Sequence, residues 1–406
     1  MIEYTHVVAS IDPDHPVPLA GRAGGARITK RVHDSLEANI LAIFDTGACN
    51  AVLISIDGVF VGRELSDALL EACTGFGVNA QSVLIVASHT HSAPALENTK
   101  PLLGVRCDDH FARVRGILVK AVSSALSSLP GRAPLRSGRA TVAAGVNRRL
   151  PRLLPQLTGR GFRFERTIMA PNPDGPVDRT VTALIMEGER TAVVWHYTCH
   201  PTGFPGDLEI SADYPGMVRN ALRRRFGADT TVIFLPGFAG DTRPQSAVSP
   251  GGVIPLLRLM AQGPRFHDMQ MDGWLGWSST ISDAVMRAID SAVPVHDVAP
   301  AGGRVSQTAL DALMVGADRN RAVEVQQLSA LGEKFVAVSA EPLLGLRELC
   351  PANSLLVGYS RDVFGYWPPE LQVRRGGYEV NGFKEWFGVP HEWRPGLDRV
   401  FSNLVV

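Results

Sequence analysis

The sequence lacks an excess of charge of either sign. Lys and Arg together number 40 and Asp and Glu together number 40, so the formal net charge is zero. Proteins that bind nucleic acids or anionic membranes usually carry an excess of positive charge. No basic stretch interleaved with aromatic residues is present either. We therefore expect neither a nucleic acid nor a membrane as a partner.

The sequence is also poor in cysteine and has no CxxC pair. The cysteines are odd in number and scattered along the chain, which argues against a disulfide framework and against a thiolate zinc cluster. This use of cysteine fits a reducing compartment. The N-terminus shows no basic segment followed by an apolar one. No apolar run approaches the roughly 18 to 20 residues of a membrane span. These features predict a cytoplasmic protein; the five cysteines are Cys49, Cys73, Cys107, Cys199 and Cys350.

The composition is that of a globular protein with a large core. The chain has 406 residues, of which 45% are hydrophobic and 20% charged. Strand patterns and helix patterns interleave along its whole length. This alternation predicts an α/β (α+β) fold with mixed β-sheets flanked by helices. We expect a single domain over residues 1–406.

Several elements can be placed from their apolar patterns. We expect a hairpin within residues 32–57, helices over 66–75, 109–128 and 281–293, and paired strands over 180–187 and 192–197. Residues 304–313 suggest a strand and 319–331 a helix. Residues 152–176, with several Arg, Pro and Gly, suggest an irregular excursion over the surface. The Pro- and Gly-rich residues 246–273 suggest a lid or an oligomer contact, and a homo-oligomer is left open.

Two histidines follow the apolar run of residues 83–87. In an extended segment, residues i and i+2 point to the same side. If this geometry persists past Ser88, His89 and His91 face one spot. Such a pair suits two metal ligands, or one ligand and one histidine that faces the substrate. An ordinary pair of histidines at a strand end is the alternative.

Two further strand ends carry candidate metal ligands. His200 follows residues 192–197, and Glu341 follows residues 335–338. Two histidines and one carboxylate with an open position for water form a common catalytic zinc site. The spacing matches no short metalloprotease motif such as HExxH. A zinc site from residues far apart in the sequence is therefore the hypothesis.

The segment Ser88-His89-Thr90-His91-Ser92 resembles the THTHSGP signature of the neutral, non-lysosomal ceramidase family. Further segments resemble this family in the same order, over most of the chain. They are Asn147-Arg148, Cys199-His200-Pro201-Thr202, Ser211-Ala212-Asp213-Tyr214-Pro215-Gly216, Gly240-Asp241-Thr242-Arg243-Pro244, Glu341, Tyr366 and Tyr378-Glu379.

The resemblance implies a zinc-dependent amidase and assigns roles to its residues. It implies that zinc is bound by four side chains, those of His89, His200, Glu341 and Tyr366. It implies that His91 and Arg148 contact polar groups of the substrate and that Tyr378 lines the pocket. With the chemistry of zinc sites, it predicts hydrolysis of an amide (C–N) bond of a small molecule by a metal-activated water.

The chain also departs from that family. Ceramidases of the family are longer, are secreted and carry a C-terminal immunoglobulin-like domain. Arg243 stands where the family has serine, and Ser246 or Ser249 is the candidate for a serine further on. These departures lead us to expect a substrate other than membrane ceramide.

Two other functions fit the same residues. One is a zinc-dependent esterase or lactonase on the same site, and the other is a metal-free binding protein without enzymatic activity. Three aspartates are candidates for the surroundings of the site. Asp57 suits turn or cap chemistry, and Asp213 is placed like an N-cap. Asp213 or Asp241 could also hold the imidazole rings of the ligands.

Overall fold

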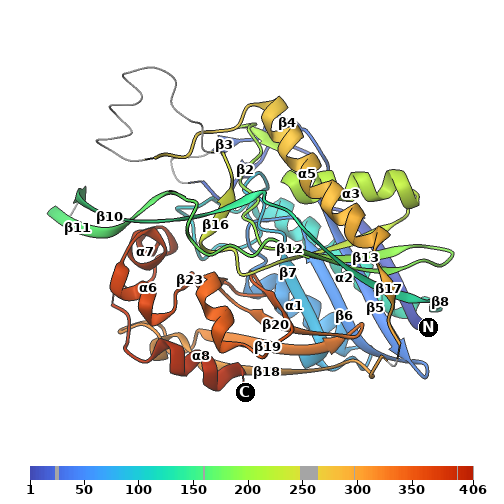
Figure 1. Ribbon diagram of the computed structural model, residues 1–406. Coiled ribbons are helices and arrows are strands. Elements are labelled where there is room, and N and C mark those ends of the chain that lie inside the picture. The colour runs from blue at the N-terminus through green and yellow to red at the C-terminus, as the bar shows by residue number, and fades with distance from the viewer. Residues whose placement is uncertain (23–26, 159–160, 247–263, 297, 391, 406) are drawn as a thin grey trace.

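The computed structural model describes residues 1–22, 27–158, 161–246, 264–296, 298–390 and 392–405. It consists of mixed β-sheets with helices on their outer faces, which confirms the predicted fold class (Figure 1). No helix in the described ranges combines the length and the apolar character needed to cross a membrane.

The first sheet, sheet I, contains the predicted hairpin, and its outer face is covered by α1 (Arg63–Thr74) and α2 (Asp108–Ser127). The hairpin strands pair antiparallel, and the strand before His89 pairs parallel to the second of them. Val114, Leu118 and Val122 lie on the buried side of α2, as helical spacing requires. In order, the strands are β7 (Val83–Ala87), β6 (Ala48–Ile56), β5 (Glu37–Asp45), β1 (Ile2–Ser10) and β8 (Gly131–Ala133).

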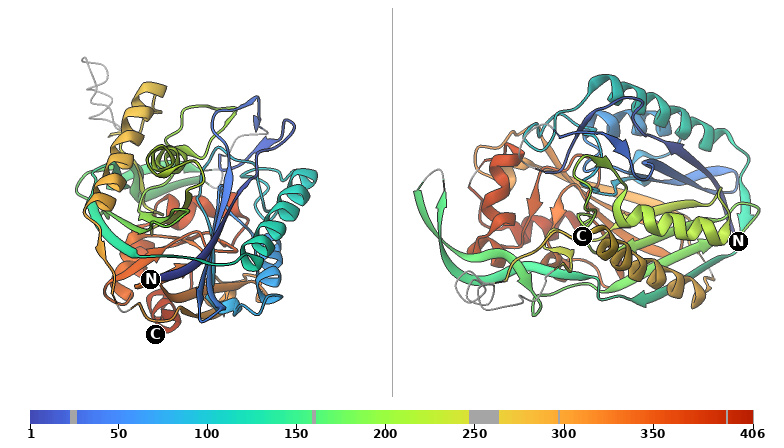
Figure 2. Two further views of the ribbon diagram at one scale, coloured as in Figure 1. Left: turned by 90° about the vertical axis from the view of Figure 1, so that its right-hand side faces the viewer. Right: turned by 90° about the horizontal axis from the view of Figure 1, so that it is seen from above.

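Sheet II carries α3 (Asp213–Phe226) and α5 (Met271–Asp290) on its outer face. Its inner face lies against sheet I (Figure 2). Apolar side chains such as Leu41, Leu53 and Leu184 pack together in one core cluster there. Helix α5 begins ten residues before the expected position at 281, so Trp274 and Trp277 belong to the helix. The strands are β15 (Thr231–Pro236), β13 (Ala192–Tyr197), β12 (Thr180–Met186), β9 (Leu135–Thr141) and β17 (Val293–Pro294).

Sheet III lies beside the β7 edge of sheet I, where Gln326 donates hydrogen bonds to the carbonyls of Gln81 and Val83. The helix expected over residues 319–331 is wrong, because this segment is a strand. Val323 and Val325 alternate with less buried residues there, and β-branched side chains suit a strand. The strands are β18 (Gly302–Ala309), β19 (Ala322–Ala330), β20 (Glu333–Val338) and β22 (Ser354–Val357).

The excursion expected over residues 152–176 is also wrong. The backbone there belongs to β10 (Gly145–Thr158) and β11 (Gly161–Asn172), a long antiparallel hairpin that projects from the body of the protein (Figure 1). The other edge of β10 pairs with β16 (Thr242–Pro244). Register shifts between Asn147 and Arg149 and between Pro151 and Leu154 absorb the irregular residues. Proline is tolerated at such irregular positions.

Each of the three sheets contains one parallel pair: β6 with β7, β13 with β15, and β20 with β22. A fourth short pair, β21 (Glu341–Pro342) and β23 (Tyr366–Trp367), is also parallel. In open α/β sheets, ligands bind at the carboxyl ends of such strands. His89, His200 and Glu341 all follow these ends, at β7, β13 and β20.

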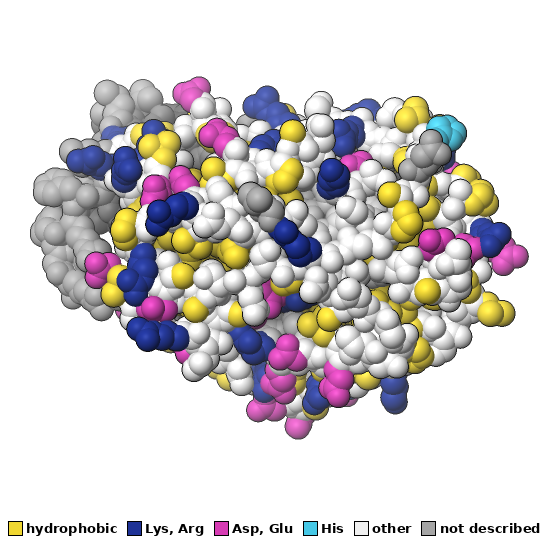
Figure 3. Space-filling model, turned by 90° about the horizontal axis from the view of Figure 1, so that it is seen from below, with side chains coloured by type: hydrophobic (Ala, Val, Ile, Leu, Met, Phe, Trp, Pro, Cys, Tyr) yellow, Lys and Arg dark blue, Asp and Glu magenta, His cyan; other side chains and the backbone are white. Residues whose placement is uncertain are grey.

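The C-terminal part of the chain forms short helices beside β23, namely α6 (Glu370–Arg375), α7 (Phe383–Phe387) and α8 (Leu397–Val405). The face of the molecule seen from below shows basic and acidic side chains interspersed with apolar ones (Figure 3). No field of one sign dominates that face, in keeping with the balanced composition.

Candidate metal centre

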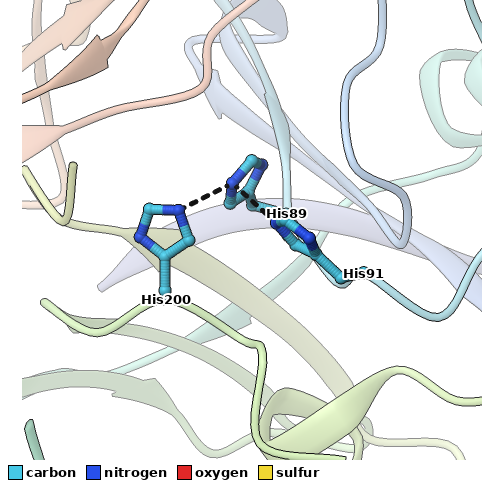
Figure 4. Close-up of side chains that lie close together, drawn as sticks. All are labelled: His89, His91 and His200. Carbon is cyan, nitrogen blue, oxygen red and sulfur yellow. Dashed lines mark hydrogen bonds between the residues drawn. The ribbon is translucent and has the colours of Figure 1, made fainter. Parts of the chain in front are cut away.

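Three histidine side chains converge where the ends of β7 and β13 meet (Figure 4). The Nε2 atoms of His89 and His200 lie 3.1 Å apart, and those of His89 and His91 lie 3.2 Å apart. His89 and His200 are buried, whereas His91 is partly exposed. These three residues could together hold a metal ion.

Strand alternation is not what brings His89 and His91 together. β7 ends at Ala87, and His89 has a φ of 66°, in the left-handed region that non-glycine residues seldom adopt. Backbone hydrogen bonds hold this conformation: the His89 N–H binds the Gly58 carbonyl at 2.8 Å. The expectation of continued extended geometry is therefore wrong, although the two rings do meet.

Backbone carbonyls fix the tautomers of His89 and His200. Nδ1 of His89 donates to the Val59 carbonyl at 2.8 Å, and Nδ1 of His200 donates to the Ala239 carbonyl at 2.7 Å. A carbonyl can only accept, so each ring carries its proton on Nδ1. Both Nε2 atoms therefore present lone pairs toward the centre of the cluster.

Glu341 faces the same point. Its Oε2 atom lies 3.3 Å from Nε2 of His89 and 3.2 Å from Nε2 of His200. The residue is 1% exposed, and Oε2 has no hydrogen-bond donor among the described residues. A buried carboxylate oxygen without a donor is costly, so this arrangement calls for a positive charge at its centre.

The spacing of these atoms fits a metal ion. A tetrahedral ion with bonds of about 2.0–2.1 Å to nitrogen or oxygen places its ligand atoms about 3.3 Å apart. The three contacts among His89, His200 and Glu341 measure 3.1, 3.3 and 3.2 Å. Imidazole and carboxylate ligands suit zinc. The residues present therefore fit such an ion.

The shifted pKa values of these residues match the protonation states that a cation needs. Burial and the positive charge of Arg148 together lower the pKa of His200 to about 4, so the ring is neutral near pH 7. The pKa of His91 is also well below its usual value, chiefly because of burial. Burial raises the pKa of Glu341, but the imidazoles of His89 and His200 outweigh it and hold this pKa well below its usual range.

Tyr366 lies opposite Glu341 in the pairing of β21 with β23, and Arg148 holds its hydroxyl group. Nη2 of Arg148 donates to the Tyr366 oxygen at 2.9 Å and to the Gly240 carbonyl at 2.6 Å. Nε of Arg148 donates to Glu379 at 2.7 Å. Burial alone would lower the pKa of Arg148, but Tyr366 and Glu379 raise it, so the guanidinium stays charged. This network orients the Tyr366 side chain beside the cluster.

Tyr378 lies next to this network. Its ring centroid is 5.8 Å from that of Tyr366 and 5.9 Å from Cζ of Arg148. Burial raises the pKa of Tyr378 to about 12, so its hydroxyl remains protonated at neutral pH. The structure thus brings together all seven residues named from the sequence: His89, His91, Arg148, His200, Glu341, Tyr366 and Tyr378.

The aspartates do not orient the imidazole rings. Asp213 lies one residue inside α3 rather than at its N-cap, with a φ of 56°. Its carboxylate accepts hydrogen bonds from the N–H groups of Gly203, Phe204 and Tyr214 and from the Trp274 indole. It therefore anchors the loop after His200, and the proposal that it fixes a tautomer is wrong.

Asp241 and Asp57 are also bound elsewhere. Asp241 accepts from the Leu344 N–H at 3.0 Å and from Asn147 at 3.3 Å, and burial raises its pKa to about 6. Asp57 accepts from Arg219 at 2.7 Å. Ser246 lines a cavity near Thr202, and Ser249 lies outside the described residues.

Tyr359, which follows β22, is a neighbour of the cluster that the sequence analysis did not single out. Its ring stacks on His89 with centroids 4.1 Å apart and planes at 25°, and its hydroxyl lies 3.4 Å from Nδ1 of His200. Its φ of 59° turns the chain there. A polar aromatic residue directly after an apolar strand was the only signal for it.

Glu379 and Arg149 were also missed as parts of the site. Nη1 of Arg149 binds Glu379 at 2.5 Å, so that one carboxylate holds two neighbouring arginines. Two adjacent arginines suggest a solvated surface, yet Arg148 and Arg149 are 6% and 4% exposed. Only the tertiary structure supplies the buried carboxylate that makes this possible.

No protein-family model matches this sequence, and no curated protein sequence matches it. Two solved structures resemble the whole chain. Neutral ceramidase from Pseudomonas aeruginosa aligns with a TM-score of 0.72 and 13% identity, covering 100% of this chain and 73% of that protein. A ceramidase complexed with C2 aligns with a TM-score of 0.74 and 13% identity, covering 100% of this chain and 74% of that protein. The chain thus has a neutral-ceramidase-like fold.

Proposed function

We propose that this protein is a zinc-dependent hydrolase that cleaves an amide bond of a small molecule. One observation carries the proposal: the buried carboxylate of Glu341 faces two imidazole nitrogens, none of the three atoms has a proton to share, and their spacing suits a tetrahedral ion. The ceramidase-like fold supports the amide bond as the target, because ceramidases hydrolyse one.

In this proposal His89, His200 and Glu341 hold the ion, and Tyr366 completes its ligands. When bound there, zinc lowers the pKa of a water molecule toward about 7 and polarises the carbonyl of the amide. The carbonyls of Val59 and Ala239 keep the two imidazoles oriented and their Nε2 atoms free of protons.

His91 and Arg148 act on the substrate. His91 is the most exposed histidine of the cluster, and its low pKa keeps the ring neutral, so that its N–H can donate to the amide oxygen. Alternatively, its unprotonated nitrogen can take a proton from the attacking water and then give that proton to the leaving nitrogen. Arg148, fixed by Glu379, presents a rigid positive charge to a carbonyl or anionic group. Tyr378 borders the space in which the substrate lies.

The test combines metal analysis with a substrate panel. Purified protein is expected to contain about one zinc per chain and to hydrolyse members of a panel of small amides faster than the matching esters; ceramide in detergent is included. His200→Ala is expected to lose both zinc and hydrolysis. His196→Gln is the matched control, because His196 is equally buried but binds the Leu356 carbonyl instead.

Each outcome decides between the candidate functions. Full zinc content in His200→Ala would overturn the site. Faster cleavage of esters than of amides would replace the amidase with an esterase on the same residues. Absence of stoichiometric zinc, together with no rise in Tm on adding zinc, would favour a binding protein without enzymatic activity.

A further inference from the structure

A cavity of about 250 Å³ lies beside the metal centre. Three residues that line it, Arg22, Thr202 and Arg243, are close to cluster residues in the chain or in space. Thr202 lies two residues after His200, and Arg243 follows Thr242, whose carbonyl accepts the His200 N–H at 3.1 Å. Arg22 follows Gly21, where an added Cβ would lie 2.8 Å from the His91 ring. The lining includes Arg22, Thr202, Arg243, Ser246, His267 and Asp268.

Arg243 places a partly buried guanidinium at this cavity. It lies in β16 and pairs through its backbone with Val146, and its guanidinium rests over the Phe266 ring at 4.3 Å. No ion pair joins it to a described residue, and its Nε atom is buried with no acceptor among them. Burial and the nearby Arg148 lower its pKa to about 10, so it is still charged at neutral pH. A partly buried guanidinium of this kind favours the binding of an anion.

The other groups of the cavity are arranged around that charge. The Thr202 hydroxyl is buried with no hydrogen-bond partner among the described residues. Arg22 pairs with Asp207 at 2.8 Å, but Asp207 is 80% exposed and well solvated. Asp268 is exposed too, and it raises the pKa of Arg243 by less than burial and Arg148 each lower it. Both carboxylates line the cavity, but they are exposed, so solvent screens their charges more than that of the partly buried Arg243 guanidinium.

We propose that this cavity binds a carboxylate group of the substrate, with Arg243 as the main contact and Arg22 and Thr202 beside it. A guanidinium matches a carboxylate with two parallel hydrogen bonds, which fixes direction as well as charge. A cavity of about 250 Å³ accommodates a carboxylate with a short side chain. The substrate class is therefore an amide that carries a free carboxylate near the scissile bond, such as an N-acyl amino acid. This assignment rests on the proposed function.

The first experiment measures binding in the absence of metal and of turnover. Protein treated with a chelator is titrated with N-acyl amino acids and with the matching neutral N-acyl amino amides, and binding is followed by calorimetry or ligand-observed NMR. The acids are expected to bind about 10- to 100-fold more tightly than the amides, the range of a charge-assisted hydrogen-bond pair. Arg243→Gln is expected to remove this preference, and Arg243→Lys to retain part of it.

Arg319→Gln serves as the matched control, because Arg319 is an 83% exposed arginine that pairs with Asp311 away from the cavity. It is expected to keep the full preference. Circular dichroism checks that each variant is folded, and Arg22→Gln, expected to weaken the preference less than Arg243→Gln, provides a second variant at the same cavity. Equal binding of acids and amides by the wild type, or an unchanged preference in folded Arg243→Gln, would overturn the proposal.

The second experiment separates this proposal from the proposed function. With zinc restored, the ratio of kcat/KM for acid over neutral amide is expected to fall about 10- to 100-fold in Arg243→Gln. Binding that depends on Arg243 without any hydrolysis would retain the carboxylate site and reject the amidase. Zinc-dependent hydrolysis with no preference for acids would retain the amidase and reject the carboxylate site.

Discussion

Asp57 and Glu341 are both buried carboxylates, with exposures of 4% and 1%, but their surroundings differ. Asp57 accepts hydrogen bonds from Arg219 at 2.7 Å and from the Glu37 N–H at 2.9 Å. Within the described part of the chain, Oε2 of Glu341 has no such donor, and it faces two imidazole nitrogens that carry lone pairs. Arg219 balances the charge of Asp57, whereas Oε2 of Glu341 has no donor of this kind among the described residues.

Asp57 has the surroundings of a structural carboxylate, unlike the candidate metal ligand Glu341. Burial raises the pKa of Asp57, and Arg219 opposes the rise, as expected for an ion pair enclosed in the core. Arg219 in turn donates to the Ser35 carbonyl at 2.7 Å and lies 3.4 Å from the Glu37 carboxylate. Burial alone therefore does not distinguish a metal ligand from a structural acid. The hydrogen-bond donors around the carboxylate make the distinction.

The largest expected effect concerns the stability of the Asp57 pair. Asp57→Ala removes the shorter of the two ion pairs of the buried Arg219 and leaves the longer one to Glu37 at 3.4 Å. Loss of a buried partner is expected to lower the free energy of unfolding by up to about 3–5 kcal/mol. Denaturant titration followed by circular dichroism measures this change. The double variant Asp57→Ala/Arg219→Met is expected to regain part of the loss. The zinc content of the folded single variant is expected to equal that of the wild type; a loss of zinc would place Asp57 in the metal site.

The second prediction concerns Glu341. Glu341→Gln removes the carboxylate that faces His89 and His200 and is expected to reduce zinc affinity by more than about 100-fold, because loss of groups that merely orient ligands already costs about 10–100-fold. Competition with a chromophoric chelator measures the affinity. Asp57→Asn is the matched control, a neutralised buried acid outside the cluster. Equal zinc affinities for both variants would show that Glu341 contributes no more to zinc binding than Asp57 does.

The third prediction tests whether the Arg148 network orients the site. Arg148→Lys keeps the charge but cannot bind Glu379, Gly240 and Tyr366 at once, as the guanidinium does. We expect kcat/KM for the best amide substrate to fall about 10- to 100-fold while zinc content is unchanged. Arg139→Lys, at a 53% exposed arginine, is the control. Wild-type kinetics in Arg148→Lys would show that the network does not act on the reaction.

The smallest expected effect concerns the pH dependence of stability and comes from a buried histidine outside the cluster. His110 in α2 is 1% exposed, and both its ring nitrogens lack partners among the described residues. Burial lowers its pKa from 6.5 to about 4, with Arg113 and His15 adding to the shift and Asp14 opposing it. Below pH 6.5 the unfolded chain binds this proton and the folded protein does not, so the free energy of unfolding falls as pH falls from 6.5 to about 4.

The change from this one group is at most about 1.4 kcal/mol per pH unit. His110→Leu is expected to reduce the loss of Tm between pH 7 and pH 5, and it does not change zinc content. Thermal melts across this pH range, followed by circular dichroism, measure the difference. Parallel pH profiles for the wild type and His110→Leu would show that this histidine is already protonated in the folded protein or makes no contribution.

Local patterns were sufficient to predict part of this fold. The β5–β6 hairpin, the β12–β13 pair, α2 and the fold class follow from apolar periodicity and turn residues, because these features depend on neighbours in the sequence. Residues 319–331 were assigned wrongly, since their apolar spacing fits a helix as well as a strand until the pairing of β19 with β18 and β20 decides. The β10–β11 hairpin was missed because its prolines and arginines conceal the pairing.

The sequence by itself determined which residue types follow the strands: histidines after β7 and β13 and a glutamate after β20. The tertiary structure decided how they meet. The left-handed turn at His89, the carbonyls that fix both imidazoles and the buried Glu379 that keeps Arg148 out of solvent all come from segments distant in the sequence. Ligand geometry depends on atoms within about 3 Å, whereas a sequence pattern specifies only local backbone direction.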